Sequence, residues 1–97
     1  MLIEYVGVDG CYVGCVVALD KGVVGWSQCN VEKDMFNKKR AIVIATGRAT
    51  KGTKAVPRRY DGEDVIGNAV VRMRSRASKY YQDTYVSPTT YKLKEVP

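Results

Sequence analysis

Eight basic side chains and no acidic one occur between Met35 and Tyr60, and this segment holds the residues best suited to binding chemistry. They are Lys38, Lys39, Arg40, Arg48, Lys51, Lys54, Arg58 and Arg59. The first 34 residues carry five acids against two lysines, so the formal net charge of +6 comes mainly from a local patch. Because a positive field of this density attracts polyanions, the segment predicts contact with the phosphates of a nucleic acid.

A second basic group is expected on a helix in the C-terminal half of the chain. Arg72, Arg76 and Lys79 fall on one stripe beside the apolar face of this helix, and Arg74 falls on its other flank. A solvated basic face is common on helices, so the group alone would indicate little. Next to the acid-free segment, however, the three aligned cations favour a track along a phosphate backbone.

Aromatic stacking is the second ingredient of single-strand recognition, and the chain has seven tyrosines. Tyr60 directly follows two arginines in an expected loop, which makes it the best candidate for stacking on a base. Tyr80 and Tyr81 lie on the apolar stripe of the second helix and are expected in the core.

Catalysis has little support. The chain has no histidine for acid–base work at neutral pH. The segment from Gly47 to Lys54 resembles the phosphate loop GxxxxGK[ST], but its last two residues are reversed and it follows a helix, so we reject nucleotide hydrolysis. A backbone nest for one phosphate stays open. We expect no enzyme and no cofactor.

Three cysteines, Cys11, Cys15 and Cys29, are too few for a four-ligand zinc site in a chain without histidine. Free cysteines are commonly buried as small apolar residues, and this is the expected role. A metal site shared between molecules is the weaker alternative.

The fold expected to position these residues is α+β: a three-stranded antiparallel β-meander followed by two α-helices packed on one face. Strands are expected at Leu2 to Val8, Cys11 to Leu19 and Val23 to Gln28. Asp9-Gly10 is a strong signal for a two-residue hairpin between the first two strands.

The first helix is expected to start at Asn37 and to run to about Ala49, although the β-branched run at 41–45 leaves a buried strand open. The second helix is expected to begin at Asp61 as its N-cap and to bury an apolar stripe from Ile66 to Tyr81. Residues 1–83 would then form one domain. Residues 84–97 would form a tail, in which 91–96 either adds an edge strand or frays.

We expect a soluble, cytoplasmic protein. The N-terminus lacks the basic and then apolar regions of a signal peptide. No apolar run approaches the roughly 20 residues that span a bilayer.

The stretch from Trp26 to Ala49 resembles a pattern in small uncharacterised bacteriophage proteins, W-S followed by D-x-F-x-K-K and I-A-x-G-R-A. It is carried here by Trp26-Ser27, Asp34 to Lys39 and Ile44 to Ala49, and it covers about a quarter of the chain. Ala41 stands where such patterns carry Gly, which favours a more regular helix. The resemblance implies a phage context, in which small basic proteins act in host takeover or counter-defence inside the host cytoplasm.

The function favoured by the sequence is binding of nucleic acid, RNA more than duplex DNA, by salt-sensitive electrostatic contacts. One alternative is a non-enzymatic inhibitor that binds an acidic surface of a host nuclease, toxin or polymerase. Another is a sponge for a phosphorylated signalling nucleotide, held by the segment 47–54. A patch that merely keeps the protein soluble is the plainest reading. The exposed edge of a small meander is compatible with a homodimer.

Overall fold

The computed structural model describes the backbone of residues 1–85 and the side chains of residues 1–81. The elements in chain order are β1 (Leu2–Val8), β2 (Cys11–Asp20), β3 (Val23–Gln28), α1 (Lys38–Lys51) and α2 (Val65–Tyr85). The strands form one antiparallel sheet in the order β1-β2-β3. This confirms the α+β class, the meander and the two following helices.

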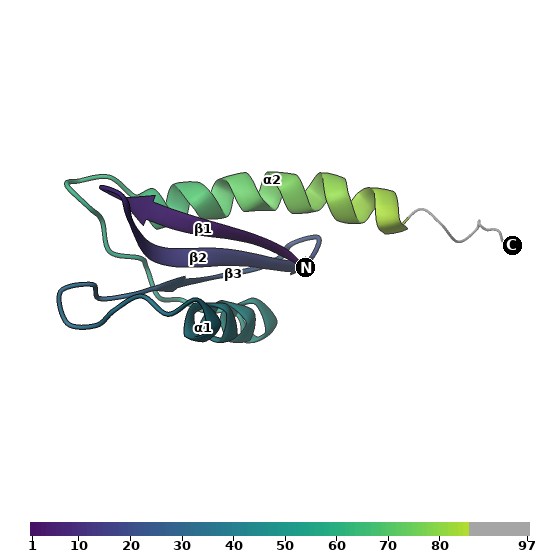
Figure 1. The fold of residues 1–97 in the computed structure, drawn as a ribbon. Helices are drawn as coiled ribbons and strands as arrows, with labels where there is room; N and C mark the ends of the chain where they lie inside the picture. Colours follow the sequence, from purple (N-terminus) through teal and green to yellow (C-terminus); the bar gives the residue numbers. More distant parts are fainter. Residues whose placement is uncertain (86–97) are drawn as a thin grey trace, which may run out of the picture.

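The two helices lie on opposite faces of the sheet (Figure 1), so the expectation that both pack on one face was wrong. The central strand β2 explains the difference. Its residues alternate between the faces: Val16 and Ala18 join the cluster under α2, while Cys15 and Val17 join the cluster under α1. Because both sides of β2 are apolar, both sides need a helix to cover them.

The α1 layer is packed through small residues. Ala41, Ala45 and Ala49 are the buried residues of α1 and face β3 and β2. A Cβ atom at Gly25 of β3 would collide with the backbone of Ala45 and Ala49. The helix and the strand therefore approach at backbone contact, which a glycine in the strand and alanines in the helix allow.

The helix starts show one confirmed prediction and one error. Asn37 caps α1, because its Oδ1 accepts a hydrogen bond from the backbone N–H of Arg40 at 2.9 Å. Asp61 does not cap α2. Its φ is 50°, and with Gly62 at 80° it forms a tight turn closed by Tyr60 and Glu63, like the turn at Asp9-Gly10. An Asp-Gly pair favours a tight turn. Because this turn occupies residues 60–63, α2 begins only at Val65.

The cap of α2 is Asp64, whose Oδ1 accepts from the N–H of Gly67 at 3.1 Å. The helix runs to Tyr85 and so continues past the expected domain end at residue 83. The candidate strand at 91–96 lies outside the described residues. None of the helices in the described part is long and apolar enough to cross a bilayer.

Candidate nucleic-acid interface

The basic residues of the segment 35–60 have no acidic partners among residues 1–81. The ion pairs formed in that part of the chain both involve Glu4, with Arg72 and Arg76. Seven of the eight predicted cations are exposed, and Arg48 is half-buried. Three of the exposed cations, residues 38–40, form the first turn of α1, where the helix dipole opposes positive charge. Their charge is therefore available to a ligand.

An aromatic cluster lies beside this first turn. The ring centroids of Tyr5 and Tyr12 are 5.5 Å apart, and Phe36 lies 6.3 Å from the first and 5.7 Å from the second. The ammonium of Lys38 lies 4.9 Å from the centroid of Tyr5 and 5.7 Å from that of Tyr12. Tyr12 is 47% exposed. The cluster thus combines an accessible ring with a cation.

The rings of this cluster stay accessible because α1 covers only part of its face of the sheet. Of the described strands, α1 packs on β2 and β3 but not on β1. The face of β1 on that side carries Ile3 and Tyr5, which only partly bury against the cluster under α1. Phe36, just before the cap, closes the gap. The sequence analysis did not single out Tyr12 and Phe36, because their proximity to Tyr5 depends on pairing between distant segments. The expected pairing of the strand 2–8 with the strand 11–19 was the signal that could have placed Tyr12 near Tyr5.

The Arg48 side chain makes contacts within the fold. Its Nη1 donates to the carbonyl oxygen of Trp26 at 3.1 Å, and its guanidinium lies 4.2 Å from the centroid of the Trp26 ring. That carbonyl belongs to the outer edge of β3. Arg48 therefore fastens α1 to an edge strand, while the exposed Lys51 and Lys54 follow at the helix end and in the next loop.

The loop with Arg58, Arg59 and Tyr60 is fastened to the end of β3. The side-chain amide of Gln28 accepts from the N–H of Arg58 at 2.8 Å and donates to its carbonyl at 2.9 Å. The same amide nitrogen donates to Tyr60 Oη at 3.1 Å.

The charged ends of these two arginines also bind the main chain. Arg58 Nη2 donates to Cys29 O at 3.3 Å, and Arg59 Nη1 donates to Gly62 O at 3.0 Å. Both side chains stay exposed, but the Tyr60 ring is half-buried and packs against the cluster under α2. The ring of Tyr60 is thus engaged by the fold, unlike that of Tyr12.

The α2 cations lie on the other face of the sheet. Arg72 Nη2 is 2.7 Å from Glu4 Oε2, and Arg76 Nη1 is 3.9 Å from Glu4 Oε1. Lys79 is exposed. Arg74, on the opposite flank, lines a groove with Trp26 and the end of α1. The structure therefore does not bring the predicted cations of α1 and α2 onto one surface.

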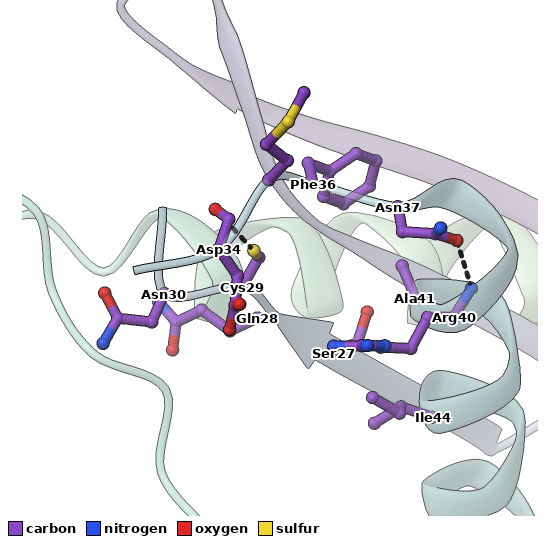
Figure 2. A pocket seen from close by; sticks show the side chains of 11 residues that line it. Ser27, Gln28, Cys29, Asn30, Asp34, Phe36, Asn37, Arg40, Ala41 and Ile44 are labelled. Carbon is purple, nitrogen blue, oxygen red and sulfur yellow. Dashed lines mark hydrogen bonds between the residues drawn. The ribbon is translucent and has the colours of Figure 1, made fainter. Parts of the chain in front are cut away.

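A pocket of about 120 Å³ lies between the end of β3 and the first turns of α1. Figure 2 shows Arg40 extending from α1 toward Ser27, with Asn37 above it and Phe36 at the rim. On the far side Cys29 Sγ donates to Asp34 O at 3.7 Å. The pocket thus borders both the basic turn and the aromatic cluster.

The three cysteines occupy separate positions. Cys15 is fully buried, and burial raises the pKa of its thiol, partly offset by the contact with Ser27 Oγ at 3.4 Å. Cys29 is half-buried, but Cys11 is exposed at the first hairpin, so the expectation of burial does not hold for it. Within the described residues no three metal-binding side chains come together.

The segment 47–54 is not a continuous loop, since residues 47–51 belong to α1 and Gly52 forms its C-cap at a φ of 78°. Comparison with known proteins adds nothing to this geometry: no family model, curated protein or solved structure matches the chain.

Proposed function

We propose that this protein binds single-stranded nucleic acid, RNA in preference to duplex DNA, without catalysing a reaction. The observation that carries the proposal is the first turn of α1. Its three exposed cations have no acidic partner among residues 1–81, and one of them lies directly over the accessible aromatic cluster. Positive charge beside exposed aromatic rings is the combination that single-strand binding requires.

In this arrangement the phosphates contact Lys38, Lys39 and Arg40, and a base stacks on Tyr12. Lys51 and Lys54, together with the two loop arginines, extend the positive surface around the edge of β3. Tyr12 takes the stacking role first assigned to Tyr60, because it is more exposed. Stacking needs an unpaired base, which RNA loops and ends present and duplex DNA does not. The resemblance to phage proteins would place this binding in host takeover or counter-defence in the host cytoplasm.

The test is fluorescence anisotropy with labelled single-stranded RNA and duplex DNA over a series of salt concentrations. We expect salt-dependent binding of the single strand, with a slope of log K against log salt of about −0.7 per phosphate contacted. Tyr12→Ala should lower the affinity for single-stranded RNA about fivefold or more, since stacking contributes about 1–3 kcal/mol per base.

Two controls separate this site from a general effect of charge. Lys21 is exposed at the turn between β2 and β3, outside the basic segment, so Lys21→Ala should lower the affinity less than Lys38→Ala. Tyr60→Phe keeps the ring that packs on the core and should leave the affinity unchanged. Absence of binding at low salt would refute the proposal and turn attention to an acidic protein partner.

A further inference from the structure

The pocket at the start of α1 has the size of a slot for one six-membered ring. Its volume is about 120 Å³. An apolar protein cavity of about 150 Å³ binds benzene, so a pocket slightly smaller than this accommodates a single ring and not a whole nucleotide. A pyrimidine base has one ring, whereas a purine has two fused rings. Size alone therefore favours a pyrimidine.

The lining of the pocket offers donors for the edge of such a ring. Figure 2 shows Asn37 and Arg40 on one side of it, at the start of α1, whereas the Asn30 amide points away from them on the other side. The amide oxygens of the two asparagines accept from backbone N–H groups of Glu32 and Arg40. Within the described residues, the amide nitrogen of Asn37 and the Arg40 guanidinium have no hydrogen-bond partner. Pyrimidine bases present ring carbonyl oxygens that such donors can bind.

The pocket is also continuous with the proposed stacking surface. Phe36 lines it and at the same time contacts the rings of Tyr5 and Tyr12. A base in the pocket and a base on Tyr12 would therefore lie on two sides of Phe36. The basic turn of α1 borders both positions and can contact the phosphate that joins them.

We propose that this pocket holds one unpaired pyrimidine base of the bound strand, with the Arg40 guanidinium and the Asn37 amide on its carbonyl edge. The inference rests on the proposed binding of single-stranded nucleic acid and adds a base preference to it. The protein as a whole binds phosphates, but the pocket reads one base.

The test compares three single strands of equal length and charge: oligouridylate, oligoadenylate and a backbone without bases. We expect the native protein to bind oligouridylate about fivefold or more tightly than the other two, the scale of one bound base. Arg40→Ala should abolish the preference over oligoadenylate, whereas part of the preference over the backbone without bases should remain, because stacking on Tyr12 is kept. Lys39→Ala removes the same charge from the same helical turn but not from the pocket, so it should weaken all three and keep the ratio. Arg40→Lys keeps the charge but loses the planar fork, so it should lower the ratio.

Two results overturn the inference, and they differ from failure of the proposed function. Equal binding of oligouridylate and oligoadenylate by the native protein, both tighter than the backbone without bases, shows stacking without a base pocket. An equal change of the ratio in Arg40→Ala and Lys39→Ala shows that charge alone is responsible. If none of the strands binds at low salt, both proposals fail. Photocrosslinking of a 4-thiouridine strand gives a second measurement: crosslinks should map to Cys29, Met35 or Phe36, and mapping to α2 would contradict the pocket.

Discussion

The two faces of the sheet are covered in different ways. Under α2 the core contains large side chains such as Ile66, Met73 and Val16, and the helix packs on all three strands. Under α1 the helix contributes only alanines to the buried set and leaves β1 uncovered. The α2 face therefore buries more apolar surface, while the α1 face keeps aromatic rings accessible.

The charges follow the same division. The cations of α2 near β1 share Glu4, whereas those in the first turn of α1 have no carboxylate partner among residues 1–81. Both groups have similar positive charge in the sequence. The comparison shows that the partners of the cations, and not their number, distinguish a surface that stabilises the fold from one that is free to bind.

The largest expected effect comes from adding a methyl group where α1 and β3 are in backbone contact. A methyl group at Gly25 would collide with the backbone of Ala45 and Ala49, which cannot move aside as a side chain can. Gly25→Ala should lower the free energy of unfolding by about 3 kcal/mol or more, at the upper end of overpacking effects. Urea or thermal denaturation followed by circular dichroism measures this.

The matched control is a second glycine, on the open side of α1. Gly47 lies within α1, and a Cβ atom there meets nothing within 4 Å. Gly47→Ala should stabilise the helix by about 0.5–1 kcal/mol, since alanine is the better helix former. Unchanged stability in Gly25→Ala would mean that α1 does not pack on β3 in this way, and destabilisation by Gly47→Ala would mean that Gly47 does not lie on the open side of the helix.

The next effect concerns binding and compares equal charge on the two faces. Replacing Lys38, Lys39 and Arg40 by alanine should lower the affinity for single-stranded RNA about tenfold or more at low salt. The slope of log K against log salt should become shallower by about 2, that is about 0.7 for each of three lost phosphate contacts. The measurement is a salt series in fluorescence anisotropy.

The matched variant removes three cations from α2: Arg72, Arg76 and Lys79. It should have a smaller effect, because Glu4 already offsets part of that charge. A larger loss in this second variant would move the binding surface to the α2 face and reverse the comparison.

Much of the fold could be predicted because its signals are local. The Asp9-Gly10 turn, the β-branched strands and the Asn37 cap each depend on a few neighbouring residues. The side of the sheet on which each helix packs depends on all three strands together, so it was missed. The aromatic cluster was missed for the same reason, since Tyr5, Tyr12 and Phe36 meet through strand pairing and the path of a loop.

A smaller effect separates the two roles given to Asn37. Its side-chain oxygen caps α1, and the residue also lines the pocket. Asn37→Ala should cost about 1 kcal/mol of stability through loss of the cap. Asn37→Asp keeps a capping oxygen and should preserve stability, but it replaces the donor with a negative charge and should weaken binding of oligouridylate. Equal binding by native protein and Asn37→Asp would remove Asn37 from the pocket.

The smallest effect is expected at the far end of the α2 face. Tyr81 donates from its hydroxyl to the carbonyl of Ala18 at 3.0 Å. Burial raises the pKa of this hydroxyl, and the charges of Tyr80 and Asp20 raise it further. The folded state thus favours the protonated hydroxyl, so its contribution is fully present below the ordinary tyrosine value of about 10 and is lost as the pH rises through the higher folded-state pKa.

Tyr81→Phe should therefore change the pH dependence more than the stability itself. At neutral pH the loss of one hydrogen bond should cost about 1 kcal/mol. Above pH 10 the melting temperature of the variant should fall less steeply than that of the native protein, because one group no longer opposes folding when it ionises. Melting curves recorded from pH 8 to about pH 11 give the comparison. If the melting temperatures of the native protein and the variant fall equally steeply above pH 10, ionisation of Tyr81 does not affect the packing of α2 on the sheet.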